Sequence, residues 1–196
     1  MTPSQNPFRS SVLQAQPYCM AEENKQALLA KLNQLHYFAC LRGPHGTGKS
    51  TLMQELAAFM KQEGKEVRWF SLHLHSSYRE KQMVLTAIWQ APHSQLHFLD
   101  GGETLGLLQW YWFCLRMKWA RKHLVATTHW PSPLPTLFKT NKNLHLLIEI
   151  VKTLAGELWS AEFERFVRAS FNKHMGNGRE VLQDCYHYCA ELQLPN

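Results

Sequence analysis

The chain has 196 residues, a length that suits one domain with room for a small second subdomain. Hydrophobic residues make up 45% of it, so we expect a packed core rather than a disordered chain. The formal net charge of +6 is spread along the chain, so it permits contact with nucleic acid without establishing it. The longest strongly apolar run, 107–115, is too short to span a bilayer, and the N-terminus lacks the apolar region of a signal peptide. These features predict no membrane partner.

The cysteines form no Cys-x-x-Cys pair and are odd in number, which favours a reducing compartment, and we expect the cytoplasm. Cys40 and Cys114 lie in apolar runs typical of small core residues. Cys185 and Cys189 are one helical turn apart, which is poor geometry for a disulfide. With His187 between them, a metal site is the alternative to simple burial.

The predicted elements alternate between helices and strands after an N-terminal segment that is rich in Gln, Ser and Pro. Apolar periodicities near 3.6 and 2 define them. In chain order we expect a helix over 22–35, a strand over 37–41, a helix after residue 48 that ends at Gly64, a strand over 66–74, a helix over 78–90, a strand over 95–99, a long helix over 105–119, strands over 124–128 and 136–139, and helices over 141–158, 161–174 and 179–192.

This alternation predicts an α/β fold in which a parallel sheet is covered by helices on both faces, an α/β/α sandwich. The last three helices predict a small C-terminal helical lid. The expected domains are an irregular segment over 1–20, an α/β domain over 21–140 and the lid over 141–196.

The helix over 105–119 is rich in tryptophan. One face is expected to pack in the core, and it carries Leu105, Leu108, Trp112, Leu115 and Trp119. Tyr111 lies off that face and is the surface candidate. The end of the helix is basic, with Arg116, Lys118, Arg121 and Lys122. These residues either contact a phosphate backbone or form a solvated surface, and the aromatic rings either pack internally or meet bases or a partner.

Residues 43–50 read Gly-Pro-His-Gly-Thr-Gly-Lys-Ser, a complete phosphate-binding loop (Walker A) between a predicted strand and a predicted helix. Its glycines let successive N–H groups point at an anion, and the helix N-terminus adds partial positive charge. Lys49 is placed to reach the β- and γ-phosphates, and the Ser50 hydroxyl to ligate Mg²⁺. The residues expected to contact the nucleotide here are Gly43, Pro44, His45, Gly46, Thr47, Gly48, Lys49, Ser50 and Thr51. The expected ligands are ATP and Mg²⁺.

Two further strands end in polar residues. Asp100 ends the predicted strand over 95–99 and suits a Mg²⁺ ligand beside Ser50. Glu103 is a candidate for polarising the attacking water, and its alternative is a solvated glutamate favoured by a helix N-terminus. Thr128 and His129 end the next strand and either sense the γ-phosphate or only satisfy loop backbone groups. The carboxyl ends of parallel strands converge on a ligand crevice, so we expect these residues near the loop.

The order of these motifs resembles the AAA+ and related ASCE-type ATPases. "ATTHWP" is similar to the sensor-1 strand of that family, with His129 where those proteins commonly carry Asn. "HMGNGREVL" is similar to the sensor-2 helix start of origin-recognition and clamp-loader ATPases, which implies that Arg179 touches the γ-phosphate from the lid. "LDGGE" resembles the acidic motif of STAND-type signalling ATPases. The resemblance implies a Mg²⁺-dependent ATPase whose nucleotide state moves the lid and switches binding of a protein partner.

This sequence departs from the family at two points. The stretch 130–140 contains no arginine finger, so that Arg121 is the nearest substitute, and the acidic motif lacks an adjacent Asp-Glu pair. Lys49, Asp100, Glu103, His129 and Arg179 are the catalytic candidates. A nucleotide-binding adaptor with little hydrolysis, on DNA or elsewhere, and a small-molecule or nucleoside kinase remain the alternatives.

Overall fold

The structure is a computed structural model that describes residues 5–18 and 20–191. The chain forms two compact units. One, here called the helical unit, consists of the described residues of 1–19, 44–48 and 141–196, and the other, the sheet unit, of 20–43 and 49–140. The tip of the phosphate-binding loop therefore groups with the helical unit. No helix within the described ranges is long and apolar enough to cross a membrane.

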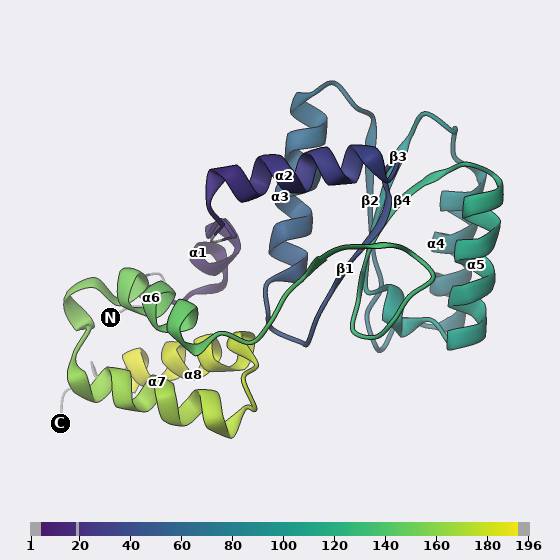
Figure 1. The fold of residues 1–196 in the computed structure, drawn as a ribbon. Coiled ribbons are helices and arrows are strands. Elements are labelled where there is room, and N and C mark those ends of the chain that lie inside the picture. Colours follow the sequence, from purple (N-terminus) through teal and green to yellow (C-terminus); the bar gives the residue numbers. More distant parts are fainter. Residues whose placement is uncertain (1–4, 19, 192–196) are drawn as a thin grey trace. The chain divides into compact units, whose positions relative to one another are not determined.

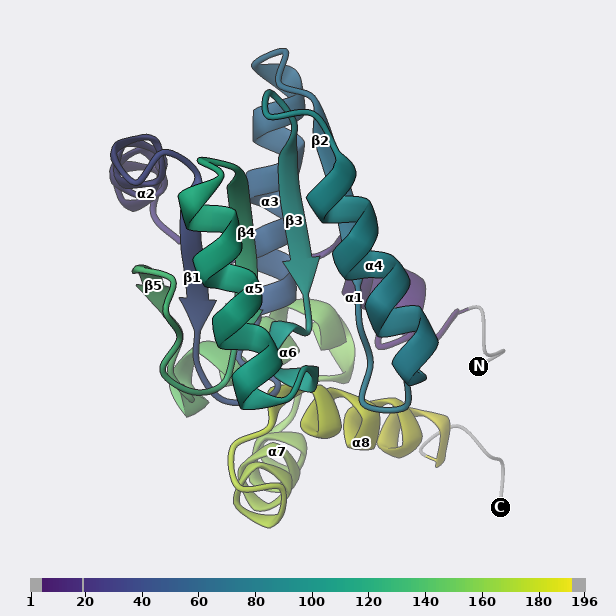
Figure 2. The same ribbon diagram turned by 90° about the vertical axis from the view of Figure 1, so that its right-hand side faces the viewer.

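The sheet unit is built on five parallel strands in the order β2-β3-β4-β1-β5. In chain order its elements are α2 (Glu22–Gln34), β1 (Phe38–Arg42), α3 (Lys49–Gln62), β2 (Val67–Ser71), α4 (Tyr78–Gln90), β3 (Leu96–Asp100), the 3-10 helix η2 (Gly102–Thr104), α5 (Leu107–Trp119), β4 (His123–Thr128) and β5 (Thr136–Lys139). Helices α2 and α3 cover one face of the sheet and α4 and α5 the other, as both views show (Figure 1 and Figure 2). The predicted α/β fold with a parallel sheet is confirmed.

Local sequence accounts for the sharpest of these boundaries. Helix α4 begins after Ser77, whose hydroxyl accepts from Glu80 N while Glu80 Oε2 accepts from Ser77 N, a capping box. Its bounds match the helix predicted over 78–90. Among the strands, β3 is buried along almost its whole length, whereas the edge strand β2 is only partly covered, in keeping with their places in the sheet.

The prediction of which face of α5 packs in the core was wrong. The buried residues of α5 are Trp110, Phe113, Cys114 and Met117, which join side chains of α4 and the sheet in one apolar core. Leu108, Trp112, Leu115 and Trp119 are instead exposed, and of the predicted face only Leu105, which precedes the helix, is buried. Helix α5 has apolar residues on both faces, so periodicity alone could not identify the inner one. Tyr111 is exposed, as expected.

The helical unit has a core of its own. It contains α1 (Ser10–Ala15), α6 (Leu144–Ala155), the 3-10 helix η3 (Gly156–Leu158), α7 (Ala161–Lys173) and α8 (Gly178–Glu191). Phe8, from the N-terminal segment, is buried in this core, where its ring meets that of Phe163 edge-on at 6.0 Å. Asn6 also donates from Nδ2 to Tyr186 O at 2.9 Å. The expectation of an irregular N-terminal segment was therefore wrong for Ser10–Ala15.

Polar contacts join α7 to α8 in this unit. The Asp184 carboxylate accepts from Ser170 Oγ at 2.8 Å and lies 2.8 Å from His174 Nε2. Cys185 and Cys189 are free thiols in the core, and burial raises their pKa values to about 12 and about 11. Both thiols are therefore neutral at physiological pH, which favours the packing role over the metal-site alternative. The predicted end of the last helix, Leu192, lies outside the described residues.

Candidate functional site

The carboxyl ends of β3, β4 and β1 lie side by side at one edge of the sheet. Strand β4 pairs with both neighbours in parallel, and Arg42, the last residue of β1, is level with Thr128, the last residue of β4. Residues at and directly after these strand ends therefore meet at this edge. They include Asp100, the last residue of β3, and Gly43 and His129, which follow β1 and β4.

Gly43 is required by close packing at the start of the phosphate-binding loop. A Cβ atom here would lie 2.1 Å from Thr140 Oγ1 and 2.4 Å from Thr140 O, far inside van der Waals contact. Its N–H donates to Thr128 O at 3.1 Å. The loop therefore leaves β1 between the ends of β4 and β5, where no side chain fits.

Lys49 is a buried cation at the first position of α3. Only 7% of its surface is exposed, and its Nζ donates to Gly43 O at 2.8 Å. Nζ also lies 3.2 Å from His129 Nδ1. An ammonium group is costly to bury unless its donors are engaged, and here the Gly43 carbonyl at the start of the loop provides an acceptor. Ser50 and Thr51 follow it in the first turn of α3.

His129 connects the loop to Glu103. Its Nδ1 lies 2.8 Å from Gly43 O, and its Nε2 lies 2.8 Å from Glu103 Oε1. Glu103 belongs to η2, directly after β3, whereas His129 directly follows β4. The structure thus brings four predicted site residues, Gly43, Lys49, Glu103 and His129, into one connected group.

Glu103 has an unusual environment for a carboxylate. Burial alone raises its pKa, but the hydrogen bond with His129 and the positive charges of His129 and Lys49 outweigh burial, so that the pKa lies below its ordinary value. The group is therefore ionised at neutral pH. Its Oε2 atom is buried and has no hydrogen-bond partner among the described residues. An ionised oxygen in such a position can accept a hydrogen bond from a donor group of a ligand or of a water molecule bound with it.

Asp100 is held by the neighbouring strand. Its Oδ1 accepts from Thr127 Oγ1 at 2.7 Å, and the same hydroxyl accepts from Gly101 N at 2.9 Å. Gly101 has a φ of +88°, and a Cβ there would lie 2.0 Å from Leu72 O, so only glycine suits this turn. The turn and Thr127 together fix the carboxylate at the strand end.

Two residues of this site were missed by the sequence analysis. Thr127 orients Asp100, and Thr140 closes the space beside Gly43. Thr127 precedes the polar pair Thr128-His129, and its pairing with Asp100 depends on β4 lying beside β3, which sequence order does not reveal. Thr128 is buried, and its hydroxyl donates to Trp130 O at 3.2 Å, which corresponds to the loop-satisfying alternative.

The helical unit contains the rest of the loop. Thr47 Oγ1 donates to Pro44 O at 2.8 Å, and His45 is exposed. Gly46 has a φ of +69°, and a Cβ there would lie 1.9 Å from Asn177 Oδ1. Residues 44–48 therefore lie against the start of α8 within this unit.

Arg179 is exposed in the first turn of α8, which begins at Gly178 as the sequence indicates. Asn177 Oδ1 accepts from Arg179 N at 3.2 Å and so satisfies one N–H group of the helix N-terminus. Within this unit, Gly178 also lies close to the loop, since a Cβ there would be 2.8 Å from Gly46 O. Arg179 is therefore the residue directly after the one that contacts the loop.

No group of three or more His, Cys, Asp or Glu side chains among the described residues could hold a metal ion. The predicted Mg²⁺ ligands, Ser50 and Asp100, are a hydroxyl and one carboxylate. Mg²⁺ at phosphate sites is commonly held by one or two protein groups, with phosphate oxygens and water completing its shell. A hydroxyl and a carboxylate are oxygen ligands of the kind that Mg²⁺ takes.

No family model matches the chain, and no curated protein matches it by sequence. Solved structures do match in fold. AMPPCP-bound DnaA from Aquifex aeolicus is similar with a TM-score of 0.51 and 15% identity, over 84% of this chain and 61% of that one. A DNA replication initiation factor is similar with a TM-score of 0.52 and 14% identity, over 92% of this chain and 63% of that one. The chain spans less than two thirds of either. At this identity the similarity shows the fold alone, an α/β fold built on a parallel sheet.

Proposed function

We propose that this chain binds ATP together with Mg²⁺ at the carboxyl edge of its sheet and hydrolyses it. The observation that carries the proposal is the buried Lys49 ammonium, which bonds to the carbonyl of Gly43 at the start of the phosphate-binding loop. A triphosphate offers this ammonium a stronger, charge-assisted partner than a neutral carbonyl. In the proposed complex, Lys49 turns from Gly43 O to the β- and γ-phosphates.

The loop and the start of α3 supply the remaining phosphate contacts in this proposal. Backbone N–H groups of 45–49 and the partial positive charge at the N-terminus of α3 receive the phosphate oxygens. Ser50 and Asp100 would hold Mg²⁺, which when bound offsets negative charge that develops on the transferred phosphoryl group. Thr127 keeps the Asp100 carboxylate oriented through its 2.7 Å hydrogen bond.

Glu103 is the proposed group that orients the attacking water. The support is its ionised carboxylate and the buried Oε2 atom without a partner in the described parts of the chain. His129 holds the other oxygen, Oε1, at 2.8 Å and so fixes the direction in which Oε2 points. Removal of His129 is therefore expected to lower turnover more than nucleotide affinity.

We further propose that Arg179 contacts the γ-phosphate and that nucleotide state thereby changes the position of the helical unit and the binding of a protein partner. The support is the contact of Gly178 and Asn177 with Gly46 inside the helical unit, which associates the start of α8 with the loop. An arginine in the first turn of a helix is unfavourable beside the positive helix end, so an anionic ligand there would compensate for it.

The decisive experiment is titration of the purified chain with a fluorescent ATP analogue and Mg²⁺. Lys49→Ala should weaken binding at least about tenfold, because a charge-assisted contact is lost. Lys61→Ala, an exposed lysine in the last turn of the same helix, is the matched control and should leave affinity unchanged. Equal affinities for the parent chain and Lys49→Ala would refute the proposed site.

Phosphate release then separates hydrolysis from binding. Glu103→Gln should bind the analogue but release no phosphate, and Asp100→Asn should lose the Mg²⁺ dependence of binding. Tight binding by the parent without phosphate release would favour the adaptor alternative instead.

The role of Arg179 is tested by comparing nucleotide affinities. Arg179→Ala should weaken the binding of ATP more than that of ADP, whereas Arg165→Ala, which changes an exposed arginine of α7, should alter neither affinity. An equal effect of Arg179→Ala on both nucleotides would mean that this residue does not contact the γ-phosphate.

A further inference from the structure

The outer face of α5 carries a continuous apolar strip that the core does not use. It consists of Leu108, Trp112, Leu115 and Trp119, with exposed fractions of 79%, 62%, 36% and 74%. Leu107 and Tyr111 are exposed beside it. Single exposed apolar residues are common on proteins, but a contiguous row along one helix marks an interaction surface. We call these four residues the α5 strip.

The spacing of the α5 strip is that of a helix-pairing seam. Its members are separated by four, three and four residues, which is the apolar repeat that places one helix along another. The leucine and tryptophan side chains at these positions offer a large apolar area that a partner can bury. A partner that matches this row is itself an amphipathic helix.

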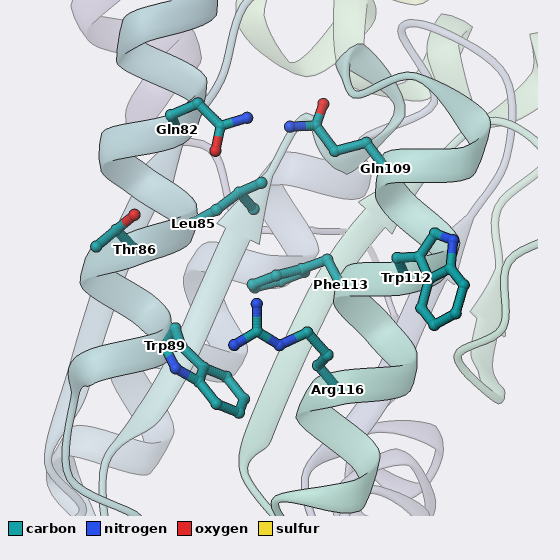
Figure 3. Close-up of a pocket in the computed structure, with 8 residues that line it drawn as sticks. All are labelled: Gln82, Leu85, Thr86, Trp89, Gln109, Trp112, Phe113 and Arg116. Atoms are coloured by element: carbon teal, nitrogen blue, oxygen red, sulfur yellow. The ribbon is translucent and has the colours of Figure 1, made fainter.

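A groove beside the strip could take an anchoring side chain of such a helix. It lies between α4 and α5, has a volume of about 250 Å³, and is lined by Gln82, Leu85, Thr86, Trp89, Gln109, Trp112, Phe113 and Arg116 (Figure 3). This is smaller than the roughly 300–1,000 Å³ of ordinary small-molecule pockets. In Figure 3 the amides of Gln82 and Gln109 face each other across the groove, while the Trp112 ring lies on the outer side of α5.

The charge around the strip favours an acidic partner. From Leu105 to His123 the chain contains Arg116, Lys118, Arg121 and Lys122 and no acidic residue. Lys122 is buried, and the guanidinium of Arg116 lies over the Trp89 ring at 4.1 Å, which leaves its edge toward solvent. Lys118 and Arg121 are exposed. Acidic side chains that flank an apolar row would meet these cations at the edge of the interface.

The same residues disfavour other occupants. Pairing of α5 with a second copy of itself would give the basic side chains of either copy no acidic partner on the facing helix, in parallel or antiparallel orientation. The leucines of the strip cannot stack on nucleic-acid bases as aromatic rings do. Lipid would cover the Gln82 and Gln109 amides without offering them hydrogen bonds.

We propose that the α5 strip is the docking surface for an amphipathic helix of a protein partner, with leucine-type residues along its apolar row and acidic residues on both flanks. The proposal goes beyond nucleotide binding and does not depend on it, because the strip lies wholly on α5.

The test uses three labelled peptides of about four helical turns, identical along a leucine row and flanked by glutamate, glutamine or lysine. Binding to the full chain without nucleotide is measured by fluorescence anisotropy. The glutamate peptide should bind at least about tenfold tighter than the lysine peptide, and this advantage should shrink as salt is raised. The double variant Trp112→Gln/Leu115→Gln should lose the binding, whereas Leu74→Gln, which changes an exposed leucine outside α5, should retain it.

Four outcomes would overturn the proposal. These are equal affinity for the glutamate and lysine peptides, unchanged binding by the double variant, preferential binding of single-stranded DNA or phosphatidylserine vesicles through the strip, and a dimer in sedimentation that the double variant abolishes. Circular dichroism of the double variant separates loss of docking from loss of fold. Lys49→Ala should still bind the glutamate peptide, so this proposal and the nucleotide proposal fail independently.

Discussion

Helices α3 and α5 cover opposite faces of the same sheet, yet only α3 places nearly all of its large apolar side chains in the core. Leu52, Met53, Leu56 and Met60 of α3 are buried, and Phe59 is its exposed exception. Helix α5 buries one apolar row and exposes a second. The difference shows that apolar periodicity identifies a helix but identifies its inner face only when the other face is polar.

The α5 side of the sheet also buries polar groups. His97 of β3 is fully buried on that side, and its Nδ1 atom lies 3.0 Å from His123 O. Lys122 is buried at the end of α4, where its Nζ bonds to Trp89 O and Ala91 O. The α4 and α5 side of the sheet therefore combines an exposed apolar strip with an interior in which buried polar side chains are held by hydrogen bonds.

The largest expected effect contrasts two tryptophans of α5. Trp110 is 2% exposed, stacks near Phe113 and donates from Nε1 to Ser132 Oγ at 3.0 Å. Trp110→Ala should lower the free energy of unfolding by about 3–5 kcal/mol, because it leaves a large cavity. Trp112→Ala should change it by no more than about 0.5 kcal/mol, since its ring is exposed. Urea unfolding followed by circular dichroism measures both, and equal losses would contradict the assignment of the two faces.

The elements of the fold were largely predictable. The helix over 78–90 and the strand over 136–139 match α4 and β5, because a capping box defines the first and a short β-prone run after a proline segment the second. The faces of α5 and the burial of Phe8 were not predictable. Both depend on which element packs opposite, and Phe8 meets Phe163, a residue far away in the sequence.

The next contrast compares two lysines near the end of α5. Lys122 Nζ donates to Ala91 O at 2.7 Å and to Trp89 O, both at the C-terminal end of α4, where carbonyls lack helical partners. Lys122→Met keeps the apolar stem but leaves these carbonyls without that donor, and should cost about 1.5–3 kcal/mol. Lys118→Met, at an exposed position of α5, should stay within about 0.5 kcal/mol of the parent. If both variants unfold at the same urea concentration, the Lys122 bonds do not stabilise the sheet unit.

The candidate site was predictable in its residue types but not in its connections. A glycine-rich loop with Lys-Ser and two polar strand ends could be recognised from spacing alone. The group formed by Gly43, His129 and Glu103 depends on β4 lying between β1 and β3, which the order of strands along the chain does not specify. For the same reason the pairing of Thr127 with Asp100 became visible only in the structure.

The smallest expected effect is a pH dependence that arises from His97, on the α5 side of the sheet. Burial lowers the pKa of His97 below its ordinary value of 6.5, and the positive charges of Lys122, Arg68 and His123 add to the shift, although the hydrogen bond with His123 O opposes it. Between the lowered pKa and 6.5 the unfolded chain binds the proton more readily than the folded one, so stability is full above 6.5 and falls as the pH drops toward the lowered value. One such group contributes at most about 1.4 kcal/mol per pH unit.

The variant His97→Leu should therefore flatten the fall in the urea midpoint between neutral and mildly acidic pH. His97 Nε2 has no hydrogen-bond partner among the described residues, so only the 3.0 Å bond between Nδ1 and His123 O is lost with the ring. That loss lowers stability at every pH and does not by itself change the slope. His93→Gln, which changes an exposed histidine in the loop before β3, is the control and should leave the slope of the parent chain intact. Equal slopes for the parent and His97→Leu would mean that His97 takes up its proton as easily in the folded chain as in the unfolded one. The α5 side of the sheet would then differ from the α3 side through the α5 strip and Lys122, without a contribution from His97.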